Sequence, residues 1–209
     1  MRGSVVRKLI LLLLLLFVVC GCARHYGYSN VLAHVDIAGN SVISLAVHDQ
    51  RSYVKTGGKH PNFIGLQRGW FGEPYDVMTE DGRPLANNMA QAIATSLGNK
   101  GYTIRLVTVT HTDTLQEVLN KLVSPETDRA LLLTVKEWKT DTKTSGRLIF
   151  DLALVVFDAK KHILIEKGIS SSKEDIGTNP KNAAPNALKD KIQLLFNDPS
   201  VVAVLKSEQ

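Results

Sequence analysis

Residues 148–157 read LIFDLALVVF, and residues 131–138, which precede them across the polar turn 140–146, read LLLTVKEW. Both stretches are rich in β-branched, aliphatic and aromatic residues and end at polar segments, so each is predicted to be a β-strand. Both faces of 148–157 are largely apolar, which is typical of a central strand. Together with residues 163–169, which follow a short polar turn, these strands are expected to form an antiparallel meander.

Helical periodicity appears elsewhere in the chain. Apolar residues recur every four positions over 85–97, directly after Pro84, which predicts a helix there. Residues 114–117 read TLQE, a capping box that predicts the start of a second helix. Residues 187–195 predict a third helix, and Asp198-Pro199 provides a cap and a first-turn proline for a short last one.

The order of these segments predicts the fold class. Two more strands are expected at residues 42–47 and 102–109, which gives the order strand, helix, strand, helix, three strands, helix. We therefore expect an α+β fold, in which a mixed, largely antiparallel sheet is packed by two to three helices. A single domain is expected over residues 31–209.

The start of the chain has the three parts of a lipoprotein signal peptide. A basic start precedes the apolar run 9–19, and Val19-Cys20-Gly21-Cys22 follows. Gly21 is the small residue needed before the cut, so residues 1–21 are predicted to be a signal peptide and Cys22 the first mature residue, carrying acyl chains such as palmitate. The alternatives are an ordinary secretory signal and an uncleaved anchor, but about 11 apolar residues fall short of the roughly 20 that span a bilayer.

Charge and cysteine content exclude several classes of function. The formal charge of the chain is +5, but three basic residues and no acidic residue lie in the leader, so the mature charge is +2. Basic and acidic side chains alternate in the remainder, which argues against nucleic-acid binding. Cys20 leaves with the leader and Cys22 would carry lipid. No thiol then remains for a disulfide or a thiolate metal site.

Two segments lack a regular period. Residues 22–30 are small, polar and aromatic, and are expected to be a lipidated tether. Residues 52–84 alternate glycine, proline and aromatic residues, and are expected to be a long structured loop. The loop supplies the candidate partner-binding residues Phe63, Trp70, Phe71 and Tyr75. The preferred interpretation is that the loop instead folds back to cover a sheet face or edge with Phe63, Ile64, Trp70 and Phe71.

No recognisable catalytic, cofactor or metal motif is present. The chain has no nucleophile elbow, no phosphate-binding glycine loop and no zinc motif, and its six histidines are scattered. In the cluster His48-Asp49-Gln50-Arg51, alternation on a strand places Asp49 and Arg51 on one face, which favours a strand-end ion pair over a catalytic dyad. Asp151 is interpreted as a rim residue paired across strands, and Trp138 as core.

The layout resembles the YajG-type family of bacterial lipoproteins over roughly residues 43–205. The resemblance rests on the lipobox, the strand ending in VHDQR at 47–51, the helix closing at Lys100-Gly101-Tyr102, the meander and the C-terminal helix. It implies an outer-membrane lipoprotein of unassigned activity. The long segment 52–84 departs from the pattern of the shorter family members. Ala23, the residue after the predicted lipidated cysteine, looks like the default for sorting to the outer membrane.

The functional expectation is a membrane-anchored envelope lipoprotein that faces the periplasm and is not an enzyme. It is expected to contact the membrane through lipid on Cys22, to use no cofactor, and to bind an envelope protein or a cell-wall component through residues 57–75. The alternative is a small-ligand or lipid-binding transport accessory. A hydrolase would need an acid/base pair that the sequence does not offer.

Overall fold

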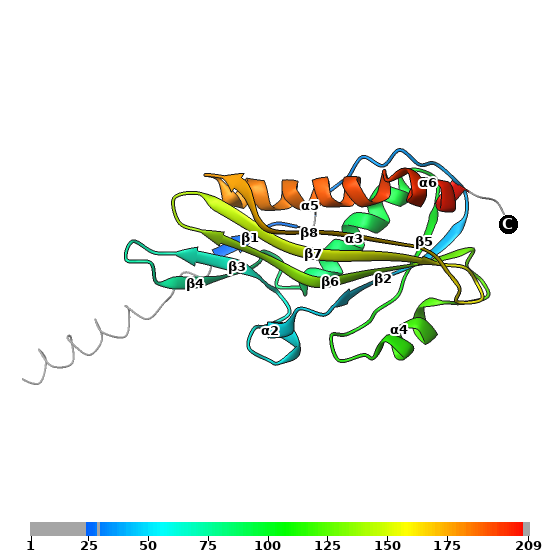
Figure 1. Ribbon diagram of the computed structural model, residues 1–209, viewed down its shortest axis with the longest axis horizontal. Coiled ribbons are helices and arrows are strands. Elements are labelled where there is room, and N and C mark those ends of the chain that lie inside the picture. The colour runs from blue at the N-terminus through cyan, green and yellow to red at the C-terminus, as the bar shows by residue number, and fades with distance from the viewer. Residues whose placement is uncertain (1–23, 29, 207–209) are drawn as a thin grey trace, which may run out of the picture.

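The computed structural model describes residues 24–28 and 30–206 and contains one mixed sheet covered by helices on both faces (Figure 1). In chain order, the strands are β1 (Arg24–Tyr26), β2 (Val42–Asp49), β3 (Phe63–Arg68), β4 (Pro74–Thr79), β5 (Thr103–Leu106), β6 (Arg129–Thr142), β7 (Gly146–Phe157) and β8 (Ile163–Gly177). The helices are α2 (Ser52–Lys55), α3 (Leu85–Gly98), α4 (Leu115–Leu122), α5 (Pro180–Phe196) and α6 (Pro199–Lys206). The expected α+β class is confirmed.

Strand β6 is the organising element of the sheet. One of its edges pairs antiparallel with β7 over nearly its whole length, and β8 continues this meander. Its other edge is shared, because β2 runs parallel to residues 129–135 and β3 runs parallel to residues 140–142. Beyond these, β5 pairs with β2, and β4 and then β1 extend the sheet from β3. The meander expected from the sequence is confirmed.

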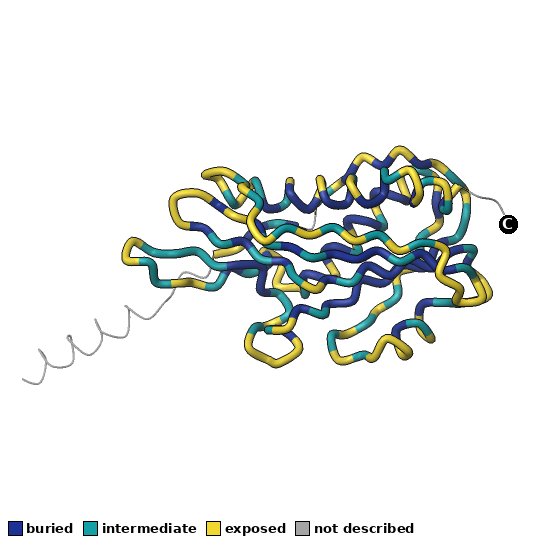
Figure 2. Tube along the Cα trace, viewed as in Figure 1, coloured by how far each residue is buried: buried dark blue, intermediate teal, exposed yellow. Residues whose placement is uncertain are grey.

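The main core lies between the sheet and the helices α3, α5 and α6. Strand β7 contributes one complete face to it, namely Leu148, Phe150, Leu152, Leu154 and Val156. A smaller cluster lies under α4, where Val118 and Leu122 meet Ala46 and Leu132. Because residues 45–47 and 131–133 alternate between the two clusters, the clusters occupy opposite faces of the sheet. Figure 2 shows the buried strands running between the exposed helix surfaces and loops.

The segment expected to be a tether is partly built into the fold. The signal peptide 1–21 and Cys22 lie outside the described residues. Within residues 24–28, however, β1 joins the sheet, and Tyr28 is buried with its hydroxyl 3.2 Å from Nε1 of Trp138. The tether prediction for residues 22–30 was therefore wrong for this part, because the partners that hold it are far away in the sequence.

The segment 52–84 is not a loop. It folds into the short helix α2 and the antiparallel hairpin β3–β4. Gly65 allows this hairpin to dock on β6, since a Cβ at this position would lie 2.5 Å from the carbonyl oxygen of Thr140. The loop prediction failed because Gly65 has a packing role here, whereas glycine-rich composition usually indicates a turn.

Candidate functional site at the hairpin end

The tip of the β3–β4 hairpin carries two fully exposed aromatic side chains. Trp70 is 89% exposed and Phe71 is 93% exposed, while Tyr75 at the start of β4 is 47% exposed. Phe63 is only 2% exposed and packs edge-to-face on Tyr53 with ring centroids 5.5 Å apart. Phe63 therefore does not belong to the candidate partner-binding set. The preferred core interpretation holds for Phe63 and Ile64 but was wrong for Trp70 and Phe71.

The local geometry explains why these aromatic residues cannot fold back. The turn is closed by a hydrogen bond from the Gly69 N–H to the Glu73 carbonyl oxygen at 2.8 Å, and Gly72 has a left-handed φ of 91°. Ladder pairing between the strands continues to Arg68 and Pro74, directly beside the turn. The tip thus projects past the rest of the sheet (Figure 1). Trp70 and Phe71 consequently stay in solvent.

The chain enters the fold from the same end as this tip. Strand β1 is parallel to β4, with Arg24 paired to Val77 and Tyr26 to Thr79. Because the strands are parallel, the direction from Arg24 back towards the N-terminus is the direction from Val77 back towards the hairpin turn. The start of the described chain and the exposed tip therefore share one end of the molecule.

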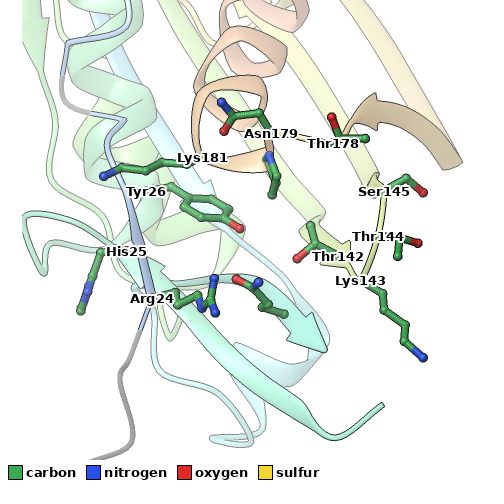
Figure 3. A pocket seen from close by; sticks show the side chains of 12 residues that line it. Arg24, His25, Tyr26, Thr142, Lys143, Thr144, Ser145, Thr178, Asn179 and Lys181 are labelled. Atoms are coloured by element: carbon green, nitrogen blue, oxygen red, sulfur yellow. The ribbon is translucent and has the colours of Figure 1, made fainter. Parts of the chain in front are cut away.

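A polar cavity of about 440 Å³ opens at this end, and we call it the Tyr26 pocket (Figure 3). It lies between β1, the β6–β7 turn and the first turn of α5. Its lining residues are Arg24, His25, Tyr26, Gln67, Thr142, Lys143, Thr144, Ser145, Thr178, Asn179, Pro180 and Lys181. Three of these side chains are cationic and none is a carboxylate.

Tyr26 forms part of the wall of this pocket, and Figure 3 shows its ring between Arg24 and Thr142. The side chain is 3% exposed, and its hydroxyl has no hydrogen-bond partner among residues 24–28 and 30–206. Burial raises the pKa of Tyr26, and the nearby Thr142 hydroxyl offsets part of that rise. Thr142 itself donates to the carbonyl oxygen of Leu66 at 3.3 Å.

The cluster at the end of β2 forms a buried ion pair. The guanidinium of Arg51 contacts the carboxylate of Asp49 at 2.7 Å, with Arg51 entirely buried. This confirms the ion-pair interpretation from the sequence. Arg51 also donates to the carbonyl oxygen of Phe63 at 2.6 Å and to that of Pro61 at 3.0 Å. All of these contacts are internal, so the cluster ties β2 to β3.

A second cavity, of about 570 Å³, is lined by two of the six histidines. His48 and His111 line it together with Asp113, and His48 Nε2 lies 2.6 Å from the Gln50 side-chain nitrogen. Burial lowers the pKa of His48, against the opposing influence of Asp113. Within the described part of the chain no group of three His, Cys, Asp or Glu side chains is placed to hold a metal. Trp138 is fully buried, as the sequence interpretation expected.

Comparisons with known proteins identify the fold. Neither a family model nor a curated protein sequence matches this chain. The crystal structure of XCC0632 from Xanthomonas campestris, a DUF330 protein, is similar with a TM-score of 0.56 and 10% identity, covering 88% of this chain and 99% of that one. This likeness shows a shared fold.

Two further solved structures are similar at lower TM-scores. The PelC dodecamer from Paraburkholderia phytofirmans has a TM-score of 0.43 and 12% identity, covering 79% of this chain and 93% of that chain. The lipoprotein GNA1162 from Neisseria meningitidis has a TM-score of 0.39 and 12% identity, covering 74% and 98%. The resemblance to YajG-type lipoproteins stays a prediction. No helix in residues 24–28 and 30–206 is long and apolar enough to cross a membrane.

Proposed function

We propose that this chain is a non-enzymatic, lipid-anchored protein of the bacterial envelope whose β3–β4 hairpin tip makes a second contact with the membrane. The observation that carries the proposal is the parallel pairing of β1 with β4, which brings the chain in from the tip side. Cys22, the predicted lipidation site, is two residues before Arg24. The lipid and the exposed aromatic residues would then meet the same surface.

Chain geometry makes this contact close. Cys22 is two residues before Arg24 in the sequence, and two residues of chain span at most about 7 Å. Pro74 precedes Val77, the partner of Arg24, by three residues, or about 10 Å along the strand. The turn that carries Trp70 lies beyond Pro74. With lipid on Cys22, the tip would then reach about as far towards the membrane as the acyl attachment, or further.

The chemistry of the tip suits the membrane interface. Tryptophan is enriched at the level of the lipid headgroups, because its ring is amphipathic, and phenylalanine adds apolar area that is favourably removed from water. Trp70 and Phe71 are adjacent and nearly fully exposed, so contact with lipid would bury both without any rearrangement of the core.

Tryptophan fluorescence tests the membrane contact directly. The chain has two tryptophans, of which Trp138 is fully buried and Trp70 is exposed. Full-length protein reconstituted into vesicles that contain brominated lipid should show quenching of the exposed component and a blue shift relative to a detergent-free, delipidated sample. The Trp70→Phe variant retains only Trp138 and should show neither change.

Crosslinking in intact cells distinguishes a membrane contact from a protein contact at the tip. A photo-crosslinker at position 70 or 71 should capture lipid, and the capture should be lost in a Cys22→Ser control. A single envelope protein captured instead, with unquenched Trp70 in vesicles, would make the tip a protein-binding surface and contradict the membrane contact. Sucrose-gradient fractionation of the same cells tests the expected outer-membrane location, which rests on Ala23.

A further inference from the structure

The Tyr26 pocket has an uncompensated positive charge. Arg24, Lys143 and Lys181 line it, and none of the three has an ion-pair partner within residues 24–28 and 30–206. Figure 3 shows Arg24 beside the Tyr26 ring, whereas Lys143 extends away from it at the rim. A lysine head on a four-carbon stem has the freedom to turn towards a bound anion.

Two carboxylates at this end of the molecule, those of Asp141 and Asp175, already accept hydrogen bonds. Asp141 accepts two hydrogen bonds from the guanidinium of Arg68, at 2.6 and 2.7 Å. Asp175 accepts from the N–H of Gly177 at 2.7 Å. The three lining cations are therefore left to attract an anion from solution, and a low-dielectric wall strengthens that attraction.

The helix α5 directs its N-terminus at the same cavity. It has 17 residues, its first residue is Pro180, and no side chain caps its first turn. Asn179 and Lys181 at this terminus both line the pocket. Pro180 has no N–H, and the N–H groups of Asn182 and Ala183 bond to the carbonyl oxygen of Asn179, so this terminus attracts an anion through the positive end of the helix dipole.

The hydroxyl of Tyr26 is an independent indication of a ligand. It is a buried donor without a partner, which costs free energy in an empty site. A phosphate oxygen in the cavity would accept a hydrogen bond from this hydroxyl after a small movement of the Thr142 side chain. The hydroxyl near it, that of Thr142, donates to the carbonyl oxygen of Leu66 instead.

We propose that the Tyr26 pocket binds a phosphate group on a polar ligand, with Arg24, Lys181 and the start of α5 neutralising its charge and Tyr26 donating to it. Three cations and a helix terminus match a doubly charged anion better than a singly charged carboxylate. The cavity of about 440 Å³ is larger than a phosphate ion, and its remaining walls, such as Gln67 and Ser145, are polar. The ligand is thus a phosphorylated headgroup or a soluble phosphate ester.

Binding of inorganic phosphate to the full chain in nonionic detergent micelles is the first test of the site. Calorimetry and phosphorus NMR measure this binding. We expect saturable binding. The Arg24→Gln/Lys181→Gln variant should weaken it by about 10-fold or more, and Tyr26→Phe by about 3- to 10-fold, the range for a hydrogen bond to a charged group. The matched controls are Lys160→Gln, an exposed lysine elsewhere, and Tyr102→Phe, a buried hydroxyl near α6.

A second probe separates the two sources of phosphate. Phosphatidylglycerol doped into the micelles, with phosphatidylcholine as the comparison, should compete with inorganic phosphate if the ligand is a lipid headgroup. Binding of inorganic phosphate without such competition assigns a soluble ester. Failure of both probes to bind, or equal losses in the control variants, would overturn the site. Trp70→Phe should leave phosphate binding unchanged, so failure of the membrane contact and failure of the pocket are distinguishable.

Discussion

Arg51 and Asp49 form a bidentate ion pair in the interior, two residues apart in the sequence, at N–O distances of 2.7 and 2.8 Å. Asp49 ends β2, and Arg51 stands between β2 and α2. The remaining guanidinium donors reach the carbonyl oxygens of Pro61 and Phe63, where β3 begins. One side chain thus satisfies a buried carboxylate and fixes the entry of the hairpin into the sheet.

Replacing Arg51 by methionine should lower the free energy of unfolding by about 3–5 kcal/mol, because it leaves the carboxylate of Asp49 buried without a counter-charge. Urea denaturation measures the change. Lys121→Met removes an exposed ion pair to Asp113 and should cost only about 0–1 kcal/mol. Equal free energies of unfolding for the two variants would show that the buried Asp49–Arg51 pair contributes no more to stability than an exposed pair.

Tyr28→Phe should destabilise the fold by about 1–3 kcal/mol, since it leaves the indole N–H of Trp138 buried without an acceptor. Tyr75→Phe, which removes a half-exposed hydroxyl, is the matched control and should have little effect. Chemical denaturation of both variants compares them. An unchanged denaturation midpoint for Tyr28→Phe would contradict a structural role for residues 24–28 and favour the tether interpretation.

The double variant Trp70→Ala/Phe71→Ala should change stability by less than about 0.5 kcal/mol, because both side chains are in solvent. Phe63→Ala, only a few residues away, should cost about 3–5 kcal/mol through the cavity it creates. Thermal unfolding distinguishes the two cases. A collapse of the double variant would mean that the tip packs on the domain.

Gly65→Ala should destabilise the protein by roughly 1–3 kcal/mol, because the added methyl would overlap the backbone of Thr140 and push β3 off β6. Gly98→Ala at the end of α3 meets no atom within 4 Å and should instead stabilise by about 0.4–1 kcal/mol. Equilibrium unfolding should show changes in the free energy of unfolding that have opposite signs for the two variants. An unchanged free energy for Gly65→Ala would contradict the close docking of the hairpin.

Acidification should weaken the fold through His48. Burial lowers the pKa of this histidine below 6.5, so the unfolded chain binds a proton more readily than the folded protein does. The contribution to stability is complete above pH about 6.5 and is lost as the pH falls below that value. His48→Gln should flatten the pH dependence of the free energy of unfolding measured between pH 5 and 7.5.

Periodic segments were predicted well because their pattern is local. The largely apolar character of both faces of 148–157 indicated a central strand, and β7 is one. The TLQE sequence indicated a capped helix, and Thr114 does accept from the Glu117 N–H. Asp198 likewise precedes α6, and Pro199 is its first residue. In each case the residues that make the element are neighbours in the chain, so sequence alone contains the signal.

Long-range contacts decided everything that the sequence analysis missed. The composition of 52–84 indicated a loop, but Gly65 is a glycine because Thr140 lies against it. The exposure of Trp70 depends on a hairpin that projects past the sheet, and the Tyr26 pocket is assembled from β1, the β6–β7 turn and α5. Strand type, helix caps and the predicted lipobox come from the sequence by itself. Which aromatic residues are core and which cations gather at one end is set by the tertiary structure, because parallel pairing unites segments that share no local pattern.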